Sequence, residues 1–146
     1  MEEIIREKTS ADHLLYVSLK YTKTCDIILN LISRWRKMID TCMEKILEKA
    51  VENGKIQSVP DNPIRRVNET KKLFKKDKDM QDVLDLYLMF RKIRELKRER
   101  IGEFRKNVNL KVQFKGEEVN INLEQLKEYA SKLEKFISST KQFLSK

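Results

Sequence analysis

The residues with the clearest chemistry are the cations that crowd the stretch from Arg91 to Lys106, here called the basic segment. It holds eight arginines and lysines against three glutamates. Apolar residues recur every three or four positions at its start, so we predict one helix over 80–107, buried at its beginning and basic at its end. On that helix the arginines would share one face, where guanidinium groups bind phosphates as bidentate partners. The predicted nucleic-acid-binding residues are Arg91, Arg94, Lys97, Arg98, Arg100 and Arg105.

The charge of the whole chain is also strongly positive, at +9, and 38% of its residues are charged. A basic balance favours an anionic partner such as RNA, DNA or a nucleotide. The alternative is a solvated lysine-rich surface, on which Glu95 and Glu99 pair with cations one helical turn away. Abundant charged residues with few glycines and prolines are also typical of proteins from thermophiles.

No other reactive residue type forms a pattern that indicates catalysis or metal binding. His13 is the only histidine, and three scattered glycines do not make a phosphate-binding loop. Cys25 and Cys42 fall on apolar positions of one predicted helix, roughly 25 Å apart and beyond disulfide reach, so we expect two core thiols. Asp82 and Asp85 share a helical face, as solvated carboxylates commonly do. We therefore predict no metal site and no cofactor.

The hydrophobic pattern predicts a single domain, 1–146, that is mainly α. We expect an antiparallel bundle of four to five helices, with a short β-hairpin near 108–122 where apolar and polar residues alternate. Residues suited to cap a helix precede most of the apolar stripes: Ser10 or Thr9, Asn62, Asp77 or Asp79, and Asn122. The predicted helices cover 10–22, 24–53, 63–76, 80–107 and 123–145.

Two features of the sequence bear on location. No run of about 18 uncharged apolar residues is present, the length that a membrane-spanning helix needs. The first ten residues carry charges where a signal peptide would be apolar. We expect a cytoplasmic protein without a membrane partner.

Three stretches suggest a family. They are ADHLLYVSLKYTKTCDII, LDLYLMFRKIRELKRERIGEFRKNV, and the hairpin with the terminal helix that follows it. In these the chain resembles the archaeal branch of HEPN-like proteins (higher eukaryotes and prokaryotes nucleotide-binding domain). The resemblance implies a small antiparallel helical bundle, often a homodimer, associated with nucleotide or RNA binding. Active members of such families are metal-independent ribonucleases of toxin and defence systems.

Those nucleases use an arginine followed four to six residues later by a histidine. The nearest match in this chain is Arg100 with Asn107, and an asparagine does not act as an acid or base. We therefore expect a non-enzymatic HEPN-like domain that binds nucleic acid or a nucleotide through its basic helix face. The alternatives are a protein-interaction module that partners a nucleotidyltransferase or toxin, and a degenerate ribonuclease. The long helical region and the exposed edge of the hairpin also lead us to expect a homodimer.

Overall fold

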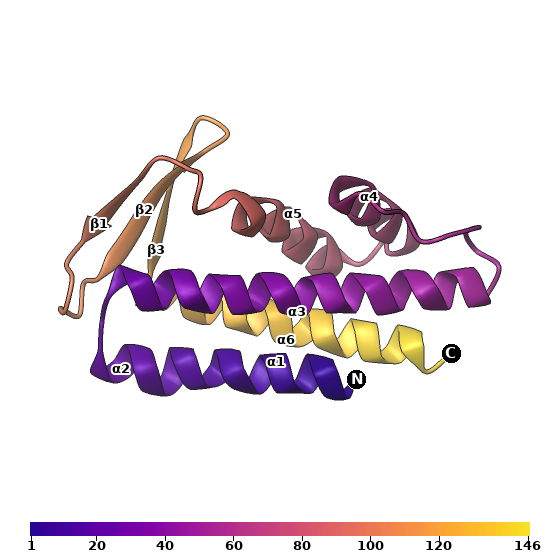
Figure 1. Cartoon of the computed structure of the whole chain (residues 1–146), viewed down its shortest axis with the longest axis horizontal. Helices are drawn as coiled ribbons and strands as arrows, with labels where there is room; N and C mark the ends of the chain where they lie inside the picture. Colours follow the sequence, from indigo (N-terminus) through magenta and orange to yellow (C-terminus); the bar gives the residue numbers. More distant parts are fainter.

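The centre of the fold is the long helix α3 (Cys25–Glu52), around which the other helices pack in the computed structural model, which describes residues 1–146 (Figure 1). Thr24 caps its start, because the hydroxyl oxygen accepts a hydrogen bond from the backbone N–H of Ile27. The helix predicted over 24–53 is confirmed. Its apolar stripe is buried from the first turn to the last, so α3, rather than the segment 80–107, organises the core.

A helical arm precedes α3. Helix α1 (Glu2–His13) continues through a π-helical turn, η1 (Leu14–Ser18), into the short α2 (Leu19–Tyr21). The sequence predicted this helix over 10–22, but it begins at the very start of the chain and has no side-chain cap. Two glutamates in its first turn suit the helix dipole, and Ile4 is fully buried, so the first turns are stabilised by packing.

Three further helices begin where the sequence placed their caps. They are α4 (Pro63–Leu73), α5 (Lys78–Lys92) and α6 (Leu123–Leu144). Each is preceded by a side chain whose oxygen accepts a hydrogen bond from a backbone N–H of the first turn. These capping residues are Asn62, Asp77 and Asn122.

The helix predicted over 80–107 is wrong beyond Lys92. The chain turns there and forms a strand, β1 (Arg98–Ile101), which pairs antiparallel with β2 (Asn109–Phe114). The arginines, lysines and glutamates of this stretch favour helix locally. As a strand, however, Arg98–Ile101 forms a backbone hydrogen-bond ladder with β2, where its residues stand opposite the buried Leu110 and Val112. Pairing with β2 therefore outweighs the local helix propensity.

The hairpin predicted near 108–122 is confirmed, but it belongs to a three-stranded sheet of order β1-β2-β3, where β3 covers Glu117–Asn122. Lys115 and Gly116 join β2 to β3 with φ values of 52° and 77°. Positive φ at both positions is what a tight two-residue hairpin turn requires. The sheet turns one apolar face to the helices, and its fully buried residues are Leu110, Val112 and Ile121.

Figure 1 shows the sheet at one end of the helical layers, beside the start of α3, with both chain termini toward the other end. The core joins the helices through an aromatic cluster of Trp35, Phe90 and Tyr129, whose ring centroids lie 5.7–6.4 Å apart. A mainly helical fold with a small antiparallel sheet is thus confirmed. None of the helices combines the length and the apolar composition needed to cross a bilayer.

Candidate nucleic-acid interface

The six predicted cations lie on several successive pieces of backbone rather than on one helix. The prediction that the arginines share a helical face is therefore wrong. Arg91 lies in the last turn of α5, Arg94 and Lys97 in the connection to the sheet, Arg98 and Arg100 in β1, and Arg105 in the loop between β1 and β2.

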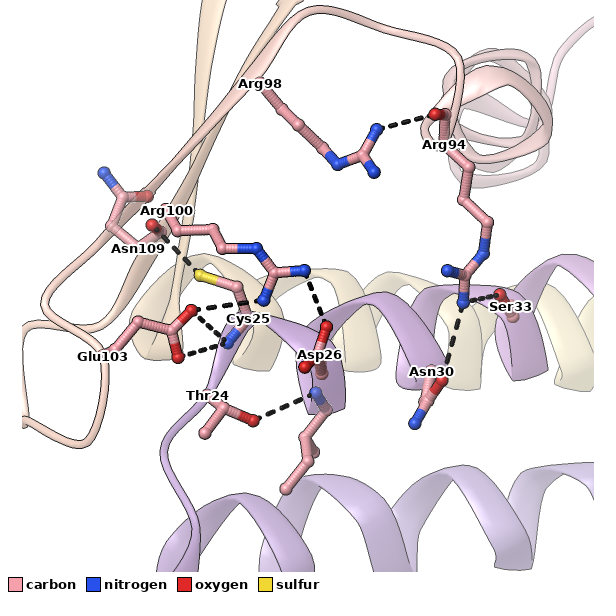
Figure 2. Close-up of polar contacts among 11 residues, drawn as sticks. Thr24, Cys25, Asp26, Asn30, Ser33, Arg94, Arg98, Arg100, Glu103 and Asn109 are labelled. Atoms are coloured by element: carbon pink, nitrogen blue, oxygen red, sulfur yellow. Dashed lines mark hydrogen bonds and ion pairs between the residues drawn. The ribbon is translucent and has the colours of Figure 1, made fainter.

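The strand nevertheless places two of these arginines together. Alternate residues of a strand point to the same side, so Arg98 and Arg100 share a face. They stand opposite Val112 and Leu110 of β2, whose side chains are buried. Both arginines therefore extend from the edge strand on the side of the sheet that faces the helices, as Figure 2 shows.

Arg94 and Arg98 are held by neutral acceptors. The Arg94 Nη2 atom lies 3.5 Å from Asn30 Oδ1 and 3.4 Å from Ser33 Oγ, both on α3. The Arg98 Nη1 atom donates to the backbone carbonyl oxygen of Arg94 at 2.6 Å, just after the end of α5 (Figure 2). These contacts position the two guanidinium groups without cancelling their charge, and each group retains N–H donors for a further acceptor.

Arg100 differs because carboxylates hold it. Its Nη2 atom lies 2.7 Å from Asp26 Oδ1, and its Nη1 atom lies 3.3 Å from Glu103 Oε1. The pKa of the Asp26 carboxyl is below its ordinary value, because it accepts a hydrogen bond from Arg100 and lies near its positive charge. The Glu103 carboxylate in turn accepts hydrogen bonds from the Cys25 backbone N–H, at the start of α3. Arg100 of β1 thus joins the sheet to α3 through its ion pair with Asp26.

Most of the positive charge in the basic segment has no acidic partner. Among the six predicted cations, Arg100 alone forms an ion pair. Lys97 and Arg105 are exposed. Glu95 and Glu99 were predicted to pair with cations one helical turn away. They form no ion pair, because the segment is not helical there. The surface between the end of α5 and the β1–β2 loop therefore carries a net positive field.

The two members of the candidate degenerate nuclease pair lie on either side of the β1–β2 loop, with Arg100 in β1 and Asn107 shortly before β2. No hydrogen bond joins Arg100 to Asn107, and the Asn107 side chain packs against Gly102. His13 lies on α1, where it lines an open pocket of about 400 Å³ with Ser10 and Arg34. The imidazole makes no hydrogen bond to either member of the pair.

No family model, curated protein or solved structure matches this chain. Its function is therefore inferred from the geometry and charge of its own residues.

The two aspartates and the two cysteines that the sequence analysis discussed lie outside the basic segment. Lys132 Nζ lies 3.4 Å from Asp82 Oδ2, and Lys71 pairs with Asp85, so the two aspartates are held by lysines of neighbouring helices. No group of three or more histidine, cysteine or acidic side chains gathers in a way that would hold a metal ion. Both cysteines are fully buried, which confirms their prediction as core thiols.

A second set of cations lies at the turn from α4 to α5, where five lysines fall between 71 and 78. Two of these lysines are already paired, Lys71 with Asp85 and Lys72 with Glu69. Asp77 and Asp79 lie in the same turn. This turn therefore has less unbalanced positive charge than the basic segment, and it is the natural comparison for it.

Three residues of the candidate interface were missed by the sequence analysis. Asp26 was not expected to meet Arg100, because the contact spans 74 positions of the chain, whereas Glu103 lies only three residues from Arg100 and was not predicted as its partner. Phe104 is 74% exposed at the tip of the β1–β2 loop. The one available indication was that a lone aromatic interrupts a charged stretch, EFRKN, which has no apolar periodicity.

Proposed function

We propose that this protein binds nucleic acid and that the basic segment, Arg91 to Lys106, contacts the phosphate backbone. The proposal depends on one observation: of the six predicted cations, only Arg100 forms an ion pair with a carboxylate. The other five keep an unpaired positive charge. The resemblance to HEPN-like proteins supports the same class of ligand. We propose accordingly that the chain is a HEPN-like binding domain.

Preorganisation also supports the proposal. A flexible arginine loses side-chain entropy when it binds a phosphate, and that loss opposes binding. Arg98 is already held by a backbone oxygen at 2.6 Å, and Arg94 makes longer contacts of 3.4–3.5 Å with Ser33 and Asn30. Part of the ordering has therefore occurred during folding, while both charges stay available to a phosphate.

The test is a fluorescence-anisotropy titration of the whole protein against labelled RNA and DNA at several salt concentrations. Each phosphate contact contributes about 0.7 to the slope of log affinity against log salt for a single strand, and about 0.9 for a duplex. Binding should therefore weaken steeply as salt rises. The double variant Lys97→Gln/Arg105→Gln should lower the affinity and flatten the slope by about 1.4 on a single strand.

The matched control is Lys75→Gln/Lys76→Gln, which removes the same charge from the turn between α4 and α5. If net charge alone mattered, both double variants would lose the same affinity. We expect the control to stay close to the unmodified protein. Absence of binding at low salt, or a larger loss in the control than in the Lys97 and Arg105 variant, would contradict the proposal.

A protein-interaction role is the second candidate, and one observation favours it. Ile5, Tyr16 and Val17 expose 51%, 53% and 41% of their surface along α1 and η1. These three residues lie along one continuous helical arm, where exposed apolar side chains favour contact with a second copy of the arm. We propose a homodimer through this surface, for which light scattering should give twice the chain mass, and Ile5→Glu should return the protein to a monomer.

A further inference from the structure

The tip of the β1–β2 loop presents an aromatic side chain to solvent from a strained backbone position. Phe104 is 74% exposed and has a φ of 66°, a conformation that bulky residues rarely adopt. Two backbone hydrogen bonds nevertheless order the loop that carries Phe104. The Phe104 backbone N–H donates to the carbonyl oxygen of Lys23 at 2.6 Å, and the Arg105 N–H donates to the Gly102 carbonyl at 3.0 Å. An ordered loop therefore holds the ring out in water.

A second exposed aromatic comes from the segment to which this loop is bonded. Tyr21 ends α2 and is 78% exposed. It precedes by two residues Lys23, the residue that accepts the hydrogen bond from Phe104. Figure 1 shows the β1–β2 loop beside the link from α2 to α3. The two most exposed aromatic side chains of the chain thus arise from neighbouring backbone segments.

Cations without acidic partners adjoin the two aromatic residues in the chain. Lys20 Nζ lies 5.8 Å from the centre of the Tyr21 ring, and the ammonium group of Lys23 bonds only to the Lys20 carbonyl oxygen. Arg105 and Lys106 follow Phe104 directly and are exposed. None of these four cations, Lys20, Lys23, Arg105 and Lys106, forms an ion pair. Exposed aromatic faces next to free positive charge are the combination that binds unpaired bases and their phosphates.

We infer that this tip, made of Tyr21, Phe104 and the adjoining cations, binds single-stranded nucleic acid by stacking unpaired bases on the two rings. The inference rests on the proposed function, since the same strand would continue along the basic segment. A duplex keeps its base faces stacked inside the helix and would gain nothing from Phe104. The tip therefore selects single strands, while the basic segment supplies affinity for any phosphate backbone.

The experiment compares a single strand of about 12 nucleotides, as RNA and as DNA, with a blunt duplex of the same length. The unmodified protein should bind the single strands more tightly. Phe104→Gly removes the ring and keeps a residue that favours the positive φ, so the loop should stay folded. This variant should lose about five-fold or more in single-strand affinity, the lower limit for one stacked base. Its duplex affinity and its salt slope should not change.

Three further variants complete the design. Phe104→Trp retains an aromatic face and should bind single strands as tightly as the unmodified protein. Tyr21→Ala should lose single-strand affinity as Phe104→Gly does. Ile64→Ala, at an exposed apolar residue of α4, is the matched control and should bind normally. Circular dichroism and the melting temperature establish that each variant is folded.

The outcomes separate this inference from the proposed function. If Phe104→Gly leaves the single-strand affinity unchanged while Lys97→Gln/Arg105→Gln still weakens binding, the tip is not a base platform and the backbone-binding function stands. If no nucleic acid binds at low salt, both fail. If Phe104-dependent binding is found with vesicles of anionic lipid and not with nucleic acid, the tip is a membrane contact and the inference is overturned.

Discussion

Arg100 and Asp26 form an ion pair between the sheet and the first turn of α3, with 2.7 Å between the guanidinium Nη2 and the carboxylate Oδ1. Glu103 lies against the other terminal nitrogen of the same guanidinium group. The arginine that most resembles a nuclease residue is therefore the one whose charge the protein neutralises itself. We assign it to joining the two parts of the fold rather than to the ligand.

The double variant Arg100→Gln/Asp26→Asn, which removes both charges of the pair, should accordingly reduce nucleic-acid affinity by less than about two-fold, whereas Lys97→Gln should reduce it by about two- to five-fold. Asp26→Asn should increase affinity, because it removes one of the two carboxylates that neutralise Arg100. Anisotropy titrations of the three variants in parallel measure this order. An equal loss in the Arg100 and Lys97 variants would contradict the assignment, and RNA cleavage that disappears in Arg100→Gln would establish the degenerate ribonuclease instead.

The lowered pKa of Asp26 gives the contact a pH dependence of known sign. A carboxyl whose pKa falls on folding stabilises the folded state above its unfolded pKa of about 3.9 and loses that contribution as the pH falls through the lowered value. The side-chain carbon resonance of Asp26 should therefore report a pKa below the ordinary aspartate value in the unmodified protein, and this pKa should rise toward the ordinary value in Arg100→Gln. If Asp26 has the same pKa in both proteins, the ion pair between Asp26 and Arg100 does not persist in solution.

Gly102 and Gly54 offer a matched pair for testing how tightly the β1–β2 loop packs. Both have positive φ, 65° and 74°, so alanine at either position should cost about 1–2 kcal/mol from the backbone alone. A β-carbon at position 54 would meet nothing within 4 Å, but at position 102 it would lie 2.7 Å from Asn107 Oδ1 and 2.8 Å from Asn107 O. Overpacking of this kind costs a further 1–3 kcal/mol or so.

Urea unfolding should therefore show that Gly102→Ala is the more destabilising of the two by about 1–3 kcal/mol. The same substitution should weaken single-strand binding, because it displaces the loop that carries Phe104. Gly54→Ala should leave binding unchanged. Equal destabilisation by the two substitutions would mean that the loop yields easily and does not hold the ring in place.

The two thiols should make the protein less stable in alkali. Burial raises the pKa of Cys42 to about 12, and burial followed by the negative charge of Glu103 raises the pKa of Cys25 to about 11. Both thiols stay neutral in the folded state, whereas in the unfolded chain they ionise near pH 8.5. Their contribution to stability is therefore complete below about pH 8.5 and is lost as the pH rises toward these folded values.

By pH 10, Cys42 should account for a loss of roughly 1–2 kcal/mol in the free energy of unfolding. Urea titrations at pH 8, 9 and 10 should show the decline, and it should be shallower in Cys42→Ala. Iodoacetamide should label both thiols only as fast as the chain opens. Rapid labelling of the native protein at pH 8 would show that the thiols are not buried as described.

The sequence determined the features that depend on near neighbours. The stripe along α3 repeats with the helical period, and Asn62, Asp77 and Asn122 stand within three residues of the N–H groups that they cap. The alternation around β2 and β3 likewise fixes a hairpin through a two-residue turn. These elements were predictable because the residues that stabilise them lie close together in the chain.

Tertiary structure determined the secondary structure of the basic segment and the partners of its charged side chains. Local propensity favours helix from Arg94 to Arg100, yet the chain leaves the helix after Lys92, and the residues from Arg98 to Ile101 pair with β2 as a strand. The sequence alone shows how many cations the basic segment contains. Which of them keep a free charge was decided only when folding brought Asp26 to Arg100, and the position of Phe104 was decided when its backbone N–H met the Lys23 carbonyl. Both outcomes depend on distance in space rather than on distance along the chain.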